Sequence, residues 1–273
     1  KDKIVLACKP MTEQYILAEI LTQLIEEKTE LKVEQQLGLA GGTSSLHPGM
    51  LAGEIDLYPE YTGTGWLFVL KKELIADQKA LYLGVKEAYA KEYSIEWSGL
   101  YGFNNTYRLA VTGEVARTYN LKTMSDLAKV SNKLTFVTNA DFFEREDGYK
   151  GLVKVYGDNF GKIDEIDIGL RYEALRSKKA DVIAVFSTDG QLADADLVIM
   201  EDDKNYFPYY DAATLIRQAV LKEHPELKAV LELLTGKIQD KDMIMMNYQV
   251  EIKKEDPKAV ARDFLSSLGL LDE

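Results

Sequence analysis

Short apolar runs alternate with amphipathic stretches over the first 65 residues, and this alternation limits the fold more than any other feature of the sequence. The runs at residues 4–7, 31–37 and 55–58 predict strands, and residues 12–28 and 45–52 predict helices between them. The longer helix opens on a threonine cap and carries its apolar residues on one face. Strands separated by helices in this way form a parallel sheet that helices cover.

A second unit of the same kind is expected further along the chain. Residues 106–112 (TYRLAVT) predict the strand that opens it. A further set of strands and helices continues it at residues 134–137, 151–155, 172–177, 182–185 and 197–200. The sequence therefore predicts a second α/β lobe.

Beyond Asp211 the pattern predicts helices only, and these are expected to pack back on the first lobe. They fall at residues 212–221, 225–234, 240–250 and 258–268. The chain then crosses between lobes near Asn105 and again near Tyr210. We accordingly expect a first lobe of residues 1–104 plus 211–273 and a second lobe of residues 105–210.

The charge of the chain argues against two classes of partner. A formal net charge of −12 disfavours nucleic acid, because phosphate binding needs clustered Lys and Arg. It disfavours anionic lipid for the same reason. The surplus of acidic residues would favour a cationic ligand, although such a surplus is more commonly a solubility feature.

The residue types give little indication of a catalytic site or a metal site. Cys8 is the one cysteine, and it lies in an apolar run where a small buried thiol is expected. His47 and His224 each precede a proline and fit no zinc spacing. The acidic residues 194–203 lack the glycine of a calcium loop, and the glycines at 38–42 lack the lysine of a phosphate loop. We expect no catalytic residue, no metal and no cofactor.

Aromatic side chains gather in segments that we expect to be loops at strand ends or at the crossings between lobes. Ligands of open α/β sheets bind beyond the carboxyl ends of the strands, so these rings are candidates for one site. Any one of them alone is more often a packing residue. The rings are Tyr58, Tyr61, Tyr107, Phe186, Tyr206, Phe207, Tyr209 and Tyr210.

Several segments together resemble the glycine betaine, carnitine and choline binding proteins of osmoprotectant ABC importers. The resemblance covers nearly the whole chain in the expected order. It implies an α/β fold of the type II periplasmic-binding-protein class, a clamshell of two lobes joined by a two-strand hinge, with the ligand in the cleft between them. The segments are residues 9–15 (KPMTEQY), 56–64 (DLYPEYTGT), 102–107 (GFNNTY), 144–149 (EREDGY), 186–190 (FSTDG) and 201–213.

By this resemblance the ligand's quaternary ammonium lies in a box of aromatic rings, and polar residues bind its other end. The box positions correspond to Tyr61, Tyr107, Phe186 and Tyr210. Phe186 replaces the more usual tyrosine, which keeps the ring face and removes a hydroxyl. The carboxylate-binding positions correspond to Lys9, Thr64 and Arg145, and Glu60 with Asn104 or Asn105 would face a thioimidazole ring if the ligand carries one.

The physics of a trimethylammonium group agrees with this implied site. The group has no N–H to donate, so only ring faces and diffuse negative charge can hold it. Each ring contributes about 0.5–2 kcal/mol, whereas association costs at least about 4 kcal/mol. Charged hydrogen bonds from Lys9 and Arg145 to a carboxylate would supply the difference. A zwitterion is therefore favoured over choline, and glycine betaine, carnitine and ergothioneine all qualify.

The resemblance also implies a partner and a location. The partner is the transmembrane permease of an ABC importer, as a separate subunit or fused in the same chain. The location is extracytoplasmic, at the outer face of the membrane, with the protein lipid-anchored, periplasmic or fused. Three alternatives stay open: a choline receptor of the same family, an enzyme that acts on quaternary amines with Glu60, Glu144 or Asp189 as its base, and a structural adhesin.

Overall fold

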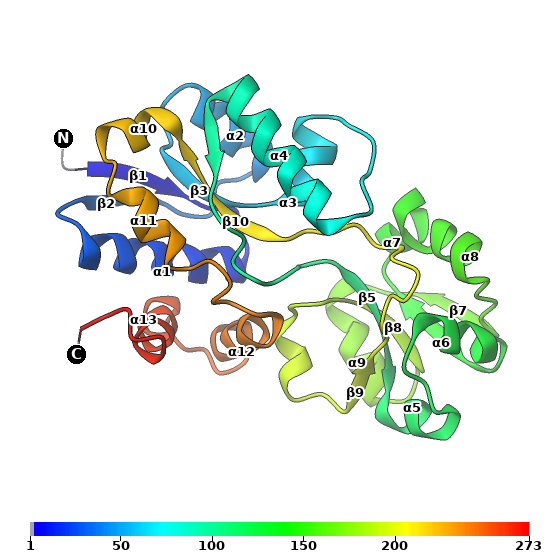
Figure 1. Cartoon of the computed structure of the whole chain (residues 1–273). Coiled ribbons are helices and arrows are strands. Elements are labelled where there is room, and N and C mark those ends of the chain that lie inside the picture. The colour runs from blue at the N-terminus through cyan, green and yellow to red at the C-terminus, as the bar shows by residue number, and fades with distance from the viewer. Residues whose placement is uncertain (1–2, 273) are drawn as a thin grey trace. The chain divides into compact units, whose positions relative to one another are not determined.

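The computed structural model describes residues 3–272 of the chain, which divides into two compact units (Figure 1). Unit 1 comprises Lys1–Asn105 and Tyr209–Glu273, and unit 2 comprises Thr106–Pro208. Each unit contains one five-stranded mixed sheet. Unit 1 is therefore assembled from both ends of the chain, and unit 2 from its middle.

The sheet of unit 1 is parallel at one side and antiparallel at the other. Its strand order is β2-β1-β3-β10-β4, and β1 pairs in parallel with both β2 and β3. Strand β10 runs antiparallel to β3 and to β4, with Tyr61 opposite Ala212. The strands are β1 (Lys3–Ala7), β2 (Lys32–Gln36), β3 (Leu57–Tyr61), β4 (Ile95–Trp97) and β10 (Ala212–Arg217).

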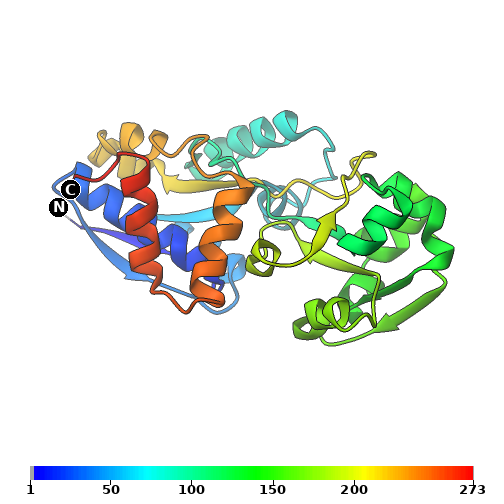
Figure 2. The same ribbon diagram turned by 90° about the horizontal axis from the view of Figure 1, so that it is seen from below.

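Helices cover both faces of this sheet. On one face α1 packs against α11, α12 and α13, and Figure 2 shows the last two, in orange and red, beside α1 in blue. The other face is packed by apolar residues of α2 and α4. The helices are α1 (Thr12–Lys28), α2 (Thr43–Leu51), α3 (Thr62–Thr64), η1 (Gly65–Val69), α4 (Gln78–Tyr93), α10 (Gln218–Glu223), α11 (Leu227–Glu232), α12 (Asp240–Glu251) and α13 (Pro257–Ser267).

Unit 2 has a sheet of order β7-β6-β8-β5-β9. Strand β6 is parallel to its two neighbours, whereas β5 is antiparallel to β8 and β9. Its strands are β5 (Tyr107–Thr112), β6 (Thr135–Thr138), β7 (Lys162–Glu165), β8 (Val182–Phe186) and β9 (Leu197–Ile199).

Helices and short turns surround the sheet of unit 2, and apolar clusters lie on its two faces. They are α5 (Gly113–Tyr119), α6 (Met124–Val130), η2 (Ser131–Lys133), α7 (Ala140–Glu144), η3 (Glu146–Lys150), α8 (Gly151–Tyr156), η4 (Ile168–Leu170), α9 (Arg171–Arg176) and η5 (Gly190–Ala193).

Two predictions of local structure are wrong. Residues 212–217 form strand β10 in place of the predicted start of a helix. Tyr61 lies within strand β3 rather than in a loop, because the strand predicted to end at Tyr58 continues through Pro59. Strand β1 pairs with β3 only at Leu57, so the proline, which has no N–H to donate, lies beyond that ladder. The later C-terminal helices α11, α12 and α13 pack against α1.

Among residues 3–272, no helix is both long and apolar enough to cross a bilayer. Within the same residues, no three histidine, cysteine or acidic side chains gather into a group that could hold a metal ion.

Candidate functional site

Two of the predicted box rings of unit 2 lie next to each other at one end of its sheet. The pairing of β5 with β8 puts Tyr107 directly opposite Phe186, and their ring centroids are 4.7 Å apart. Phe142 packs against Tyr107 from α7, with centroids 5.2 Å apart. Both Tyr107 and Phe186 remain half-buried. The strand register therefore creates an aromatic pair that keeps part of its surface accessible.

A buried arginine and a half-buried aspartate support Phe186 from within unit 2. The Arg171 guanidinium lies 5.5 Å from the centroid of the Phe186 ring and donates to the carbonyl of Ala184 at 2.6 Å. Asp189 accepts the Phe186 N–H at 3.0 Å and the Tyr172 hydroxyl at 2.8 Å. Burial raises the pKa of the Asp189 carboxyl, against the opposing effect of Arg171. These contacts fix the backbone and ring of Phe186. No motif in the sequence marks Arg171 for this role.

In unit 1 the two predicted box tyrosines come from the end of β3 and from the segment before β10. Tyr61 is the last residue of β3. A Cβ on Gly63 would lie 2.7 Å from the Tyr210 ring and 2.6 Å from the Tyr209 carbonyl oxygen, so glycine is needed for this close approach. The Tyr61 hydroxyl donates to Glu13 and accepts from Gln14. Tyr61 is buried, whereas Tyr210 is half-buried.

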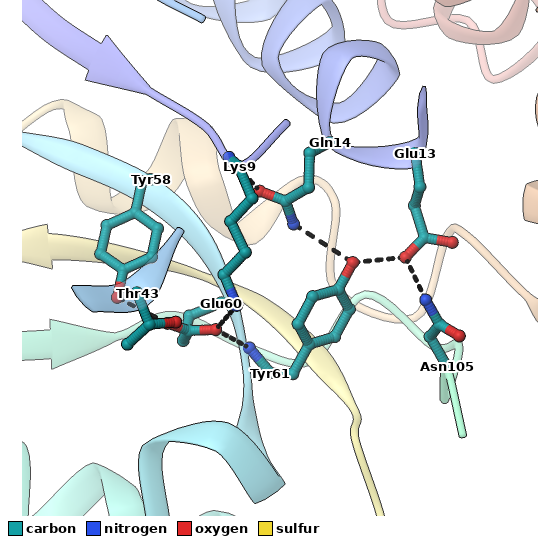
Figure 3. A network of polar contacts seen from close by, with 8 residues as sticks. All are labelled: Lys9, Glu13, Gln14, Thr43, Tyr58, Glu60, Tyr61 and Asn105. Atoms are coloured by element: carbon teal, nitrogen blue, oxygen red, sulfur yellow. Dashed lines mark hydrogen bonds and ion pairs between the residues drawn. The ribbon is translucent and has the colours of Figure 1, made fainter. Parts of the chain in front are cut away.

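Lys9 and Glu60 form a buried ion pair beside Tyr61 (Figure 3). The Glu60 side chain is 0% exposed and also accepts hydrogen bonds from Tyr58 at 2.7 Å and Thr43 at 2.8 Å. The Lys9 Nζ lies 4.9 Å from the centroid of the Tyr61 ring. Glu60 therefore neutralises Lys9 and holds it against the tyrosine.

Two other predicted polar positions of unit 1 have defined places. Thr64 is half-buried at the end of α3, directly after the glycine that contacts Tyr210. Asn104 accepts the Tyr210 N–H through Oδ1 at 2.7 Å, and its own N–H donates to Asp240 at 2.9 Å. Asn104 thus fixes the backbone of Tyr210.

Arg145 is engaged by acidic neighbours in unit 2. Its Nε and Nη2 donate to Asp147 at 2.7 and 2.6 Å, and its Nη1 lies 3.7 Å from Asp141. The hydrogen bonds to Asp147 raise the pKa of Arg145 and lower that of Asp147. Burial raises the pKa of the Tyr107 hydroxyl, and the nearby charge of Arg145 opposes this effect. The guanidinium therefore lies near the aromatic pair but is already paired with a carboxylate.

Comparison with known families decides the class of this chain. The family described as the substrate binding domain of the ABC-type glycine betaine transport system matches residues 2–267. The chain belongs to this family. The resemblance inferred from the sequence is thereby confirmed, and the family is one of transporter components rather than of enzymes.

Individual relatives of this substrate-binding domain are also named as transport or binding proteins. It is 46% identical to the ergothioneine transport permease/ergothioneine binding protein EgtU of Helicobacter pylori (strain G27), over 98% of this chain and 48% of that protein. It is 40% identical to the carnitine transport binding protein OpuCC of Listeria monocytogenes, over 97% of this chain and 86% of that one. The domain thus spans about half of the length of the Helicobacter relative.

The fold of the substrate-binding domain is also that of solved relatives. A crystal structure described as a glycine betaine/carnitine/choline ABC transporter superposes with a TM-score of 0.92 at 34% identity, covering 98% of this chain and 100% of the other. The predicted periplasmic-binding-protein class, with two α/β lobes, is confirmed. Family membership makes the domain an extracytoplasmic component of an importer.

Proposed function

We propose that this domain captures a trimethylammonium zwitterion of the betaine class and delivers it to an ABC permease. The observation that carries the proposal is the pair of half-buried rings, Tyr107 and Phe186, held in register at the end of the unit 2 sheet. Tyr61 and Tyr210 would complete the aromatic box from unit 1. Such a box recognises a cation that has no hydrogen-bond donor of its own.

Lys9, Thr64 and Arg145 would bind the carboxylate of the ligand. Glu60 takes one of the three N–H donors that an ammonium carries, so Lys9 keeps others for a ligand. Its charge is already neutralised by Glu60, which lowers the cost of desolvating it. Glu60 and Asn104 would then serve the site indirectly, by holding Lys9 and the backbone of Tyr210.

The names of the relatives indicate which ligands of this class to consider first. The Helicobacter protein is named for ergothioneine and the Listeria protein for carnitine, so both join glycine betaine as candidates, with ergothioneine first because that relative is the more similar. We also propose that this chain works with a transmembrane permease and is located at the outer face of the membrane. Its attachment there would be by a lipid anchor, by fusion to the permease, or by retention in a periplasm.

A calorimetric panel of ergothioneine, carnitine, glycine betaine and choline tests the proposed function. We expect at least one zwitterion to bind about tenfold more tightly than choline, because its carboxylate adds a charged hydrogen bond of roughly 1.5–3 kcal/mol. Choline binding more tightly than every zwitterion would favour the choline receptor. Recovery of a ligand of altered mass would favour the enzyme, and no binding at all would overturn the proposal.

The role of Arg145 can be tested through the difference between two ligands. If Arg145 binds a ligand carboxylate, Arg145→Ala should weaken glycine betaine by about tenfold or more, since a charged hydrogen bond is lost, and should affect choline much less. If Arg145 only holds Asp147, both ligands should weaken alike. Arg117→Ala removes an exposed arginine of unit 2 that is paired at 3.8 Å with Asp196, and it should change neither affinity.

A further inference from the structure

A buried carboxylate, Glu13, lies directly behind the predicted box residue Tyr61 (Figure 3). Glu13 is in the first turn of α1 and is 3% exposed. Its Oε2 accepts the Tyr61 hydroxyl and the Asn105 side-chain amide at 3.0 Å. Its Oε1 accepts the side-chain amide of Asn247, on α12, at 3.3 Å. One carboxylate therefore joins a helix start, a strand end, a second helix and the last residue of the first segment of unit 1.

The contacts of Glu13 favour its charged form. A carboxylate that accepts several neutral donors is stabilised as the anion. Burial, together with this interaction, keeps the pKa of the Tyr61 hydroxyl well above its ordinary value, so the phenol remains a donor. The result is a neutral phenol hydrogen-bonded to a buried negative charge.

The face and the hydroxyl end of the Tyr61 ring lie near different charged groups. Lys9 lies over the ring, but Glu60 accepts a hydrogen bond from the same ammonium and cancels its charge. Glu13 places its carboxylate at the hydroxyl end of the ring. A phenol that donates to an anion gains electron density on its ring, and the attraction of a ring for a cation depends on that density.

We propose that Glu13 determines the preference of the site for a cationic ligand by polarising and positioning Tyr61. Glu13 is a positioning residue, because it acts through the tyrosine hydroxyl and does not itself touch the ligand. The proposal rests on the proposed function, since it needs Tyr61 to be part of a site for a quaternary ammonium group. A residue that merely filled space would affect charged and uncharged ligands equally.

Glu13→Gln is the variant that separates charge from shape. The glutamine Oε1, in the place of Oε2, still accepts from Tyr61 and Asn105. Rotation of the Asn247 amide presents an oxygen to the new NH₂ group. Glu27→Gln is the matched control, because it removes one charge from an exposed position near the other end of the same helix.

The probes are glycine betaine and 3,3-dimethylbutanoate (the tert-butylacetate anion). They have the same shape and the same carboxylate, but only glycine betaine carries a positive charge. Calorimetry, at millimolar concentrations where needed, measures both affinities. We expect Glu13→Gln to weaken glycine betaine about fivefold or more while changing tert-butylacetate less than about twofold. Glu27→Gln should leave the ratio of the two affinities unchanged.

Two outcomes would overturn this inference while leaving the proposed function in place. In the first, the wild-type protein binds a zwitterion, and Glu13→Gln weakens the binding of both probes by the same factor. The other is an undiminished effect of Glu13→Gln in a Tyr61→Phe background, because the charge would then act without the hydroxyl. A wild-type protein that binds no trimethylammonium ligand contradicts the proposed function itself.

Discussion

Glu60→Ala is expected to lower the free energy of unfolding by about 3–5 kcal/mol, because it leaves the buried Lys9 ammonium without its counter-charge. The Lys9 and Glu60 side chains are 10% and 0% exposed. The variant also removes the acceptor of the Tyr58 hydroxyl and of Thr43. Chemical denaturation, followed by circular dichroism, measures the change.

A second lysine and glutamate pair of unit 1 provides the control. Lys3 and Glu34 bridge β1 and β2 with side chains 62% and 41% exposed, so Glu34→Ala should cost less than about 1 kcal/mol. Removing both buried charges, in Lys9→Met with Glu60→Gln, should recover part of the stability lost in Glu60→Ala. Equal losses in the free energy of unfolding for Glu60→Ala and Glu34→Ala would show that the stability does not depend on the charge of the buried pair.

Tyr107→Ala is expected to weaken the ligand that binds best in the panel by about tenfold or more, because it removes a ring face and admits water beside the cation. Tyr210→Ala should have an effect of the same size from unit 1. Phenylalanine at either position keeps the ring and should cost less. Calorimetry on variants with wild-type circular dichroism spectra measures these affinities.

Tyr119→Ala is the control for the loss of a ring from unit 2. Tyr119 ends α5, which follows the opposite end of β5 from Tyr107, and its ring lies 5.7 Å from the ammonium of Lys133. It should leave the affinity unchanged. Wild-type affinity in both Tyr107→Ala and Tyr210→Ala would contradict the aromatic box, whichever ligand the domain takes.

The strands and helices of the first 65 residues were predictable because each has a clear period, and the error at β10 shows where that signal ends. Residues 212–216 are apolar or small except for Thr214, and all are buried between β3 and β4. A short run that is buried on every side has no polar face, so its period cannot separate a strand from a helix. Only the pairing with β3, far away in the sequence, decides it.

The candidate site was predictable by residue type but not by contact. The rings at Tyr107 and Phe186 follow from strand ends, which the sequence marks. The pairing of Lys9 with Glu60, and of Arg145 with Asp147, depends on which carboxylate each cation reaches after folding. Glu13 is an acid of the first turn of α1, a common position for a solvated acid, and it is buried where α12 packs against that helix.

The construction of unit 1 from both ends of the chain sets an order for its assembly. During synthesis β3 emerges early, yet its antiparallel neighbour β10 follows only after all of unit 2, and β4 pairs with β10. Unit 2 is continuous and can complete its sheet first, which brings Asn105 and Tyr209 to fixed positions and shortens the search of β10 for β3. Until β10 arrives, the edge of β3 that it will cover is unpaired, and an unpaired strand edge is where a partly folded chain can aggregate.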